Sequence, residues 1–143
     1  MAHATQDQNV EPFPLIETGE RVVVPPEGAH PFYTKYINAG GVVIVSSDAV
    51  PDAALIAAYR TILHLTSHRP DVLEAMLPYK PRISILGLSE PASDLPEFGS
   101  SSDGEWGLGQ MPDSSTSLVS VRGVCYPGNS EYRANFLLHE FVH

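Results

Sequence analysis

The side chains best suited to chemistry stand in residues 137–143, which read LLHEFVH. His139 and His143 are four positions apart, so on a helix their imidazoles lie one above the other and can bind a single metal ion. Glu140 lies about 100° around the helix axis from His139 and can reach a water bound to that metal. Zinc lowers the pKa of such a water, and a nearby carboxylate takes its proton as the hydroxide attacks a peptide carbonyl. The pattern predicts zinc ligation by His139 and His143, with Glu140 as general base.

The residues around this pattern favour a helix. Chance alone produces the five-residue pattern in roughly one or two sequences per hundred of similar histidine content. The surrounding residues must therefore show whether the pattern marks a metal site. Ser130 is a suitable N-cap for the segment EYRANFLLHEFVH. Its apolar residues make one face of that segment hydrophobic; they are Phe136, Leu137, Leu138, Phe141 and Val142. We therefore expect a buried amphipathic helix that carries the metal ligands.

The elements that must position this helix are predicted from hydrophobic patterning upstream. Residues 41–47 (GVVIVSS) and 82–88 (RISILGL) are apolar runs of strand length, and 53–68 form a helical pattern that follows Pro51 and Asp52. The apolar stripe of that helix recurs at steps of three and four; it comprises Leu55, Tyr59, Ile62, Leu63 and Thr66. A second short helix is expected at 70–77. Strand, helical crossover and strand predict a βαβ unit with covered parallel strands.

The rest of the chain is predicted to be an arm, a long loop and one more strand. Residues 1–32 are rich in proline and read as an extended arm, with an edge strand at the β-branched run 22–24. Residues 33–143 read as one α+β domain. Residues 89–117 are dense in Pro, Gly, Ser and acidic residues and are expected to form a long loop. This loop is either functional or simply a solvent-exposed surface loop. Residues 117–123 (SLVSVRG) alternate like a half-buried strand.

Composition narrows the classes of partner. The chain has 143 residues, a net charge of −9 at pH 7 and only two lysines, Lys35 and Lys80, which disfavours binding to a phosphate backbone. Its one cysteine, Cys125, forms no internal disulfide. No apolar run approaches transmembrane length, so no membrane partner is expected. The first ten residues lack the apolar region of a signal peptide.

Several segments resemble a family of H-E-x-x-H proteins from bacteria and fungi, often secreted, that comprises zinc metallopeptidases and relatives. The most specific part is CYPGNSEYRANFLLHEFVH, and the resemblance extends back to about Tyr33 through YTKYINAGGVVIVSS, RISILG and SDLPEF. It implies a zincin-like N-terminal subdomain: a mixed sheet with βαβ crossover helices and the H-E-x-x-H helix beneath it. It also implies zinc ligation by His139 and His143, Glu140 as general base, a peptide or protein substrate, and secretion.

The sequence departs from this family where the motif ends. Zincins take a third protein ligand from downstream of the motif, whereas His143 is the last residue here, so two histidines are expected to hold zinc weakly or not at all and peptidase activity to be impaired. His64 and His68 form a second i, i+4 pair, which the stripe opposite them indicates to be solvent-exposed. Cys125 could supply a thiolate, although a buried structural thiol is the stronger interpretation.

A second hypothesis is a small non-proteolytic defence toxin on the same scaffold, for example one that inactivates ribosomes by acting on ribosomal RNA. Aromatic, acidic and basic side chains of the kinds that stack on and attack a nucleotide are available, although the acidic balance counts against this partner. They are Tyr59, Arg60, Glu74, Arg82, Glu97, Glu105, Trp106, Arg122, Tyr126, Glu131, Tyr132 and Arg133. Whether the protein is an enzyme therefore stays open at this point.

Overall fold

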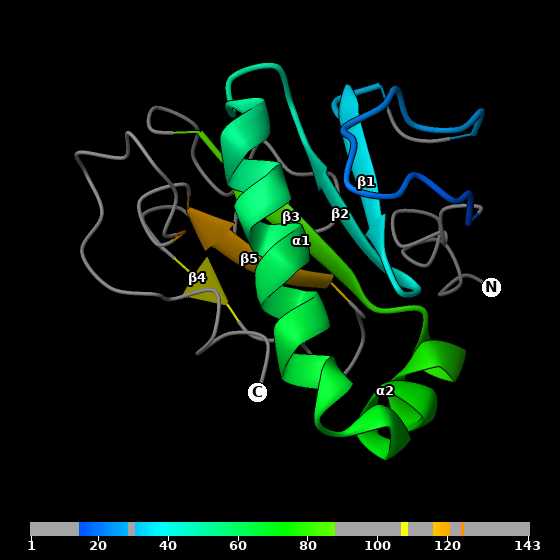
Figure 1. Cartoon of the computed structure of the whole chain (residues 1–143). Coiled ribbons are helices and arrows are strands. Elements are labelled where there is room, and N and C mark those ends of the chain that lie inside the picture. The colour runs from blue at the N-terminus through cyan, green and yellow to red at the C-terminus, as the bar shows by residue number, and fades with distance from the viewer. Residues whose placement is uncertain (1–14, 29–30, 88–106, 109–115, 121–123, 125–143) are drawn as a thin grey trace, which may run out of the picture.

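The computed structural model describes residues 15–28, 31–87, 107–108, 116–120 and 124. Within these ranges the chain forms an α+β fold, in which a long helix lies across one face of a mixed β-sheet (Figure 1). This agrees with the α+β class expected from the sequence. No helix in the described ranges is both long and apolar enough to span a bilayer.

The sheet has five strands in the order β1-β2-β3-β5-β4. Their bounds are β1 Lys35–Ala39, β2 Val42–Ser46, β3 Arg82–Leu86, β4 Gly107–Leu108 and β5 Thr116–Ser120. Neighbouring β2, β3 and β5 run parallel, whereas β1 and β4 pair antiparallel at the two edges. The sheet is therefore mixed, with its parallel strands at the centre where both faces can be covered.

Two helices and a short 3₁₀ turn connect β2 to β3. They are α1 (Asp52–Ser67), α2 (Pro70–Met76) and η2 (Leu77–Tyr79). Pro51 stands at the N-cap of α1 and Asp52 in its first turn, where a carboxylate favours the positive end of the helix dipole. Since β2 and β3 pair in parallel register, Ile44 opposite Ile83, the predicted βαβ crossover is confirmed.

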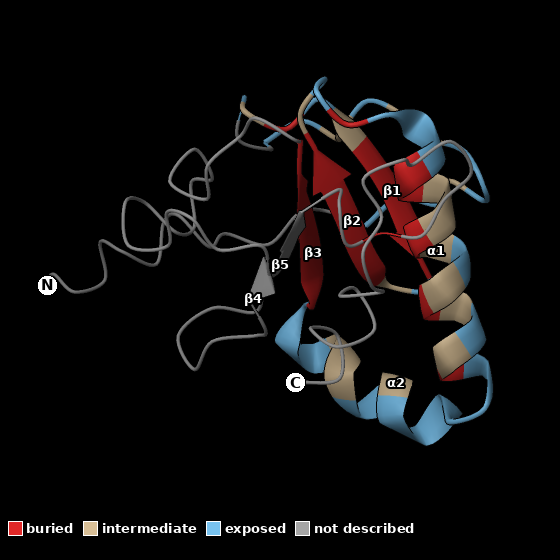
Figure 2. Cartoon of the chain, turned by 90° about the vertical axis from the view of Figure 1, so that its left-hand side faces the viewer, coloured by how far each residue is buried: buried red, intermediate tan, exposed pale blue. Residues whose placement is uncertain are grey.

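The main core lies between α1 and the sheet. Leu55, Ile62 and Thr66 of the predicted stripe are buried, and Tyr59 and Leu63 pack half-buried at its border. Figure 2 shows the buried side of α1 turned toward the strands and its exposed side turned away. The sheet contributes the inward residues of three strands; the cluster comprises Ile37, Ala39, Val42, Ile44, Val50, Ala54, Leu55, Ala58, Ile62, Ile83, Ile85 and Val124.

The opposite face of the sheet is also buried, but it mixes apolar and polar side chains. Tyr36, Val43, Val45 and Leu86 belong to its cluster. In β3, the residues between the inward isoleucines alternate to this second face, which places buried Ser84 there within 2.9 Å of the Tyr33 hydroxyl. Strands buried on both faces explain why β2 and β3 read as continuous apolar runs.

The β1–β2 hairpin turns through two glycines. Ala39 pairs with Val42, which leaves Gly40 and Gly41 as a two-residue loop with φ of +65° and +109°. Positive φ at both central positions is the requirement of a type I′ hairpin turn, and glycine meets it without a steric penalty. The strand β1 was not predicted, although Gly-Gly between two apolar runs is a recognisable hairpin signal.

The segment 15–28 lies along β1. Val23 exchanges two backbone hydrogen bonds of 2.9 Å with Tyr36, so the predicted edge strand exists only as an isolated bridge. Asn38 donates from its side-chain amide to the Ile16 carbonyl at 3.0 Å. The Thr18 hydroxyl accepts the backbone N–H of Asn38 at 3.1 Å. These contacts satisfy backbone groups that the edge of a sheet otherwise leaves exposed.

The long-loop prediction for residues 89–117 was wrong in part. It overlooked β4, which pairs antiparallel with β5 through Gly107 opposite Val119, and it assigned the start of β5 to the loop. Two residues of a Gly-rich segment carry no periodic signal, and only pairing with a neighbouring strand makes them a strand. The strand predicted at 117–123 is confirmed as Thr116–Ser120, with residues 121–123 outside the described ranges.

Candidate functional site

The predicted zinc ligands His139 and His143 and the predicted base Glu140 lie outside the described residues, as does Cys125. Their ligation stays a prediction from the sequence pattern. The structure instead describes the framework from which the chain runs toward the motif, and the positions of the other candidate residues.

The described part of the chain ends with β5 and Val124. Among the described residues, β5 is the last strand before the motif. It lies between β3 and β4, parallel to β3 and antiparallel to β4. Val124 is 1% exposed and belongs to the core cluster on the α1 face of the sheet. The chain is therefore anchored on that face fifteen residues before His139.

His64 and His68 lie near the carboxyl end of α1, and both are exposed, as the position of the apolar stripe predicted. Their ring centroids are 5.1 Å apart and the rings meet edge to face, with an interplanar angle of 89°. The structure thus brings these two imidazoles together. Among the described residues, no group of three or more His, Cys, Asp and Glu side chains gathers in a way that could hold a metal ion.

A charged pair lies beside the histidines. The Arg69 guanidinium donates two hydrogen bonds to the Asp71 carboxylate, of 3.0 and 2.9 Å. This bonding lowers the pKa of Asp71 to about 2 and raises the pKa of Arg69. Each charge therefore has an opposite charge beside it, at the point where the chain turns from α1 into α2.

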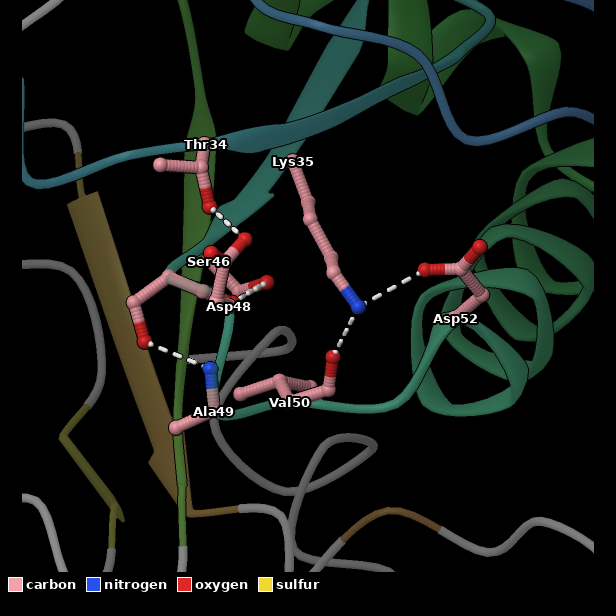
Figure 3. Close-up of polar contacts among 8 residues, drawn as sticks. Thr34, Lys35, Ser46, Asp48, Ala49, Val50 and Asp52 are labelled. Atoms are coloured by element: carbon pink, nitrogen blue, oxygen red, sulfur yellow. Dashed lines mark hydrogen bonds and ion pairs between the residues drawn. The ribbon is translucent and has the colours of Figure 1, made fainter.

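Lys35 closes the loop between β2 and α1. Its ammonium group donates to the Val50 carbonyl at 2.6 Å and pairs with the Asp52 carboxylate at 2.8 Å (Figure 3). The Lys35 side chain is only 20% exposed, so both partners compensate the loss of hydration of its charge. This arrangement links β1 to the first turn of α1, and we interpret its role as structural.

The same loop is held from its other side by hydroxyl groups. The Thr34 hydroxyl donates to Asp48 at 2.7 Å (Figure 3). The Ser47 hydroxyl accepts the Ala49 backbone N–H at 3.2 Å. Short-range bonds of this kind are typical of turns in which Ser and Asp substitute for backbone partners. The contacts between Thr34 and Asp48 and between Lys35 and Asp52 were not predicted, because their partners are separated along the chain and meet only in the folded sheet.

The residues proposed for a nucleotide-binding surface do not share one site in the described part of the chain. Tyr59 packs half-buried at the core, and exposed Arg60 pairs with Glu20. Arg82 is 4% exposed and alternates to the face of β3 away from α1. A buried guanidinium is not placed to stack on a base. Apart from exposed Glu74, the remaining eight lie outside the described residues.

The chain was compared with models of protein families, with curated proteins and with solved structures, and none of these comparisons finds a match.

Proposed function

We propose that this chain carries the metal-binding helix of a zinc metallopeptidase-like protein, zincin-like in fold, which hydrolyses peptide bonds when its metal site is complete. The observation that carries the proposal is the H-E-x-x-H pattern of His139, Glu140 and His143, in a segment whose sequence predicts an amphipathic helix. The proposed substrate is a peptide or protein, and the proposed setting is extracellular.

The described framework supports this proposal at the level of architecture. The resemblance implied a mixed sheet with a βαβ crossover and a motif helix packed beneath the sheet. The sheet is mixed, β2 and β3 flank a helical crossover, and β5 precedes the motif. Val124 belongs to the core on the α1 face of the sheet, fifteen residues before His139, which is compatible with the proposed motif helix beneath this sheet.

The donor set suits zinc, which prefers nitrogen and sulfur ligands in a tetrahedral arrangement. His139 and His143 supply two imidazole nitrogens, and both must be neutral to bind. Zinc, when bound, lowers the pKa of a water and polarises a carbonyl. Glu140 then accepts the proton of the water and passes it to the departing amine.

Two histidines are one ligand fewer than the three protein ligands that catalytic zinc sites use. The proposal therefore commits to metal binding through His139 and His143, and it makes peptide hydrolysis conditional on a third ligand. Binding by the two alone is expected to be weaker than binding by a complete site.

Calorimetric titration with Zn²⁺ near neutral pH tests the proposal. The protein should carry His64→Ala and His68→Ala, so that the exposed pair on α1 adds no signal. We expect one-to-one binding that is lost in a further His139→Ala variant. Glu140→Gln is the matched control, since it should retain zinc while abolishing any hydrolysis of an unstructured peptide substrate.

Zinc binding unchanged by His139→Ala and by His143→Ala would reject the proposal. The alternative, a defence toxin acting on ribosomal RNA, is favoured by no observation in the described residues. It would gain support if a motif-independent activity on ribosomes persisted in the His139→Ala variant.

A further inference from the structure

We propose that His64 and His68 form a second metal site, a two-histidine surface site for a divalent transition-metal ion on the last turn of α1. The proposal is independent of the H-E-x-x-H motif and of peptide hydrolysis. It rests on the geometry of two described side chains, on their exposure and on the end of the helix at which they stand.

The backbone places both residues in helical register. His64 lies within α1, and His68, the C-cap residue, retains helical angles of φ −87° and ψ −13°. Residues four apart on a helix stack on one face, so the two side chains leave the same side of α1. That side is opposite the buried stripe, and neither imidazole belongs to the core.

The separation of the rings matches that of two imidazoles bound to one ion. With metal–nitrogen bonds of about 2 Å and a roughly tetrahedral angle between them, the ring centres stand about 5 Å apart. The observed centroid distance is 5.1 Å. The edge-to-face orientation converts to a chelating one by rotation about each Cβ–Cγ bond, a torsion with a broad energy profile. Both side chains are exposed, which leaves this rotation free of core packing.

The electrostatic surroundings favour a cation. The carboxyl end of a helix carries partial negative charge on its last carbonyl groups. Arg69 follows directly but is paired with Asp71, so its positive charge is largely compensated. The chain as a whole has a net charge of −9, which attracts cations to its surface.

The donor type defines the class of metal. Imidazole nitrogen suits Zn²⁺, Cu²⁺ and Ni²⁺, whereas Mg²⁺ and Ca²⁺ prefer oxygen. Two protein ligands leave the remaining coordination positions to water. We therefore expect Cu²⁺ to bind more tightly than Zn²⁺, in the usual order of affinities, and Mg²⁺ not to compete.

The test is a Zn²⁺ titration of the full chain that carries His3→Ala, His139→Ala and His143→Ala. His30, His64 and His68 are then the only remaining histidines. We expect one-to-one binding that either His64→Ala or His68→Ala weakens by about tenfold or more, because each removes the chelate advantage of a second linked ligand. His30→Ala is the matched control and should leave the affinity unchanged.

The ring protons of His64 and His68 should shift together in NMR spectra during this titration. His68→Gln serves as a second variant if His68→Ala perturbs the C-cap, with far-UV circular dichroism as the check on folding. Absence of Zn²⁺ binding, or binding that survives either single substitution, would overturn the proposal. Because the motif histidines are already removed, neither outcome bears on the proposed peptidase-like function.

Discussion

Backbone conformation and packing both constrain Gly41. Its φ is +109°, and a Cβ atom there would lie 2.5 Å from Cδ2 of Leu77. The neighbouring Gly40 has φ of +65°, within the left-handed helical region, and a Cβ there would make ordinary contacts of 3.6 Å with Leu63 and Leu73. The two glycines of one turn therefore differ in what they tolerate.

We predict that Gly41→Ala lowers the free energy of unfolding by about 1–3 kcal/mol, since alanine must adopt a strained conformation and displace the Leu77 side chain. Gly40→Asn is the matched control, because asparagine tolerates the left-handed region, and its effect should stay within about 0.5 kcal/mol. Urea denaturation measures both. Equal losses in the two variants would contradict this account of the turn.

The spacing of His139, Glu140 and His143 made a candidate metal site recognisable from the sequence alone. The motif predicts chemistry because each position has a role that depends only on helical geometry. The spacing of the exposed pair His64 and His68 was equally visible in the sequence. The distance between their rings and their shared exposure required the structure.

At the scale of elements, the Asn38 side chain contacts both the β1–β2 turn and the segment 15–28. Asn38 is buried at 7% exposure. Its side-chain amide donates to the Ile16 carbonyl, and its side-chain oxygen accepts the Gly41 N–H at 2.7 Å. One residue therefore stabilises both the β1–β2 turn and the segment that lies along β1.

We predict that Asn38→Ala destabilises the protein by about 1–3 kcal/mol, since it leaves buried polar groups without partners. Amide hydrogen exchange of residues 16–23 should accelerate. Asn38→Asp separates the two roles, because it keeps the acceptor for Gly41 but loses the donor to Ile16. In that variant exchange should accelerate in the segment while the turn stays protected.

Glu20→Gln is the comparison for this experiment. It weakens the pairing with Arg60, which is exposed, and such pairs contribute at most about 1 kcal/mol. Exchange of residues 16–23 that responds to Glu20→Gln as strongly as to Asn38→Ala would show that the surface pair, and not Asn38, holds the segment.

At the scale of the whole molecule, stability should depend on alkaline pH through Tyr36. Burial raises the pKa of its phenol, a hydrogen bond from the Ile16 backbone N–H opposes that shift, and the negative charge of Glu17 adds to it. The folded state therefore holds the phenolic proton more tightly than the unfolded chain. The resulting stabilisation is complete below the unfolded pKa of about 10 and is lost as pH rises through the higher folded pKa.

We predict that the free energy of unfolding falls more steeply above about pH 10 in the unmodified protein than in Tyr36→Phe, which has no proton to lose at this position. Urea denaturation across this range measures the two slopes. Tyr79→Phe is the control, since Tyr79 is 70% exposed and its removal should leave the slope unchanged. Parallel slopes for all three proteins would contradict the prediction.

The α+β class, the βαβ crossover and the buried face of α1 could all be inferred from the sequence. These features depend on periodicity and on local signals such as Pro51 and Asp52, which act over a few residues. The H-E-x-x-H motif is local in the same sense, so its proposed chemistry follows from residue types and spacing.

The antiparallel pairing of β4, the order of the strands and the polar links between distant segments could be learned only from the folded chain. β4 is a strand because β5 lies beside it, and Lys35 meets Asp52 because β1 pairs with β2 next to the start of α1. Such features depend on hydrogen bonds and charges brought together across the sheet. Local propensity carries no record of a partner that is distant along the chain.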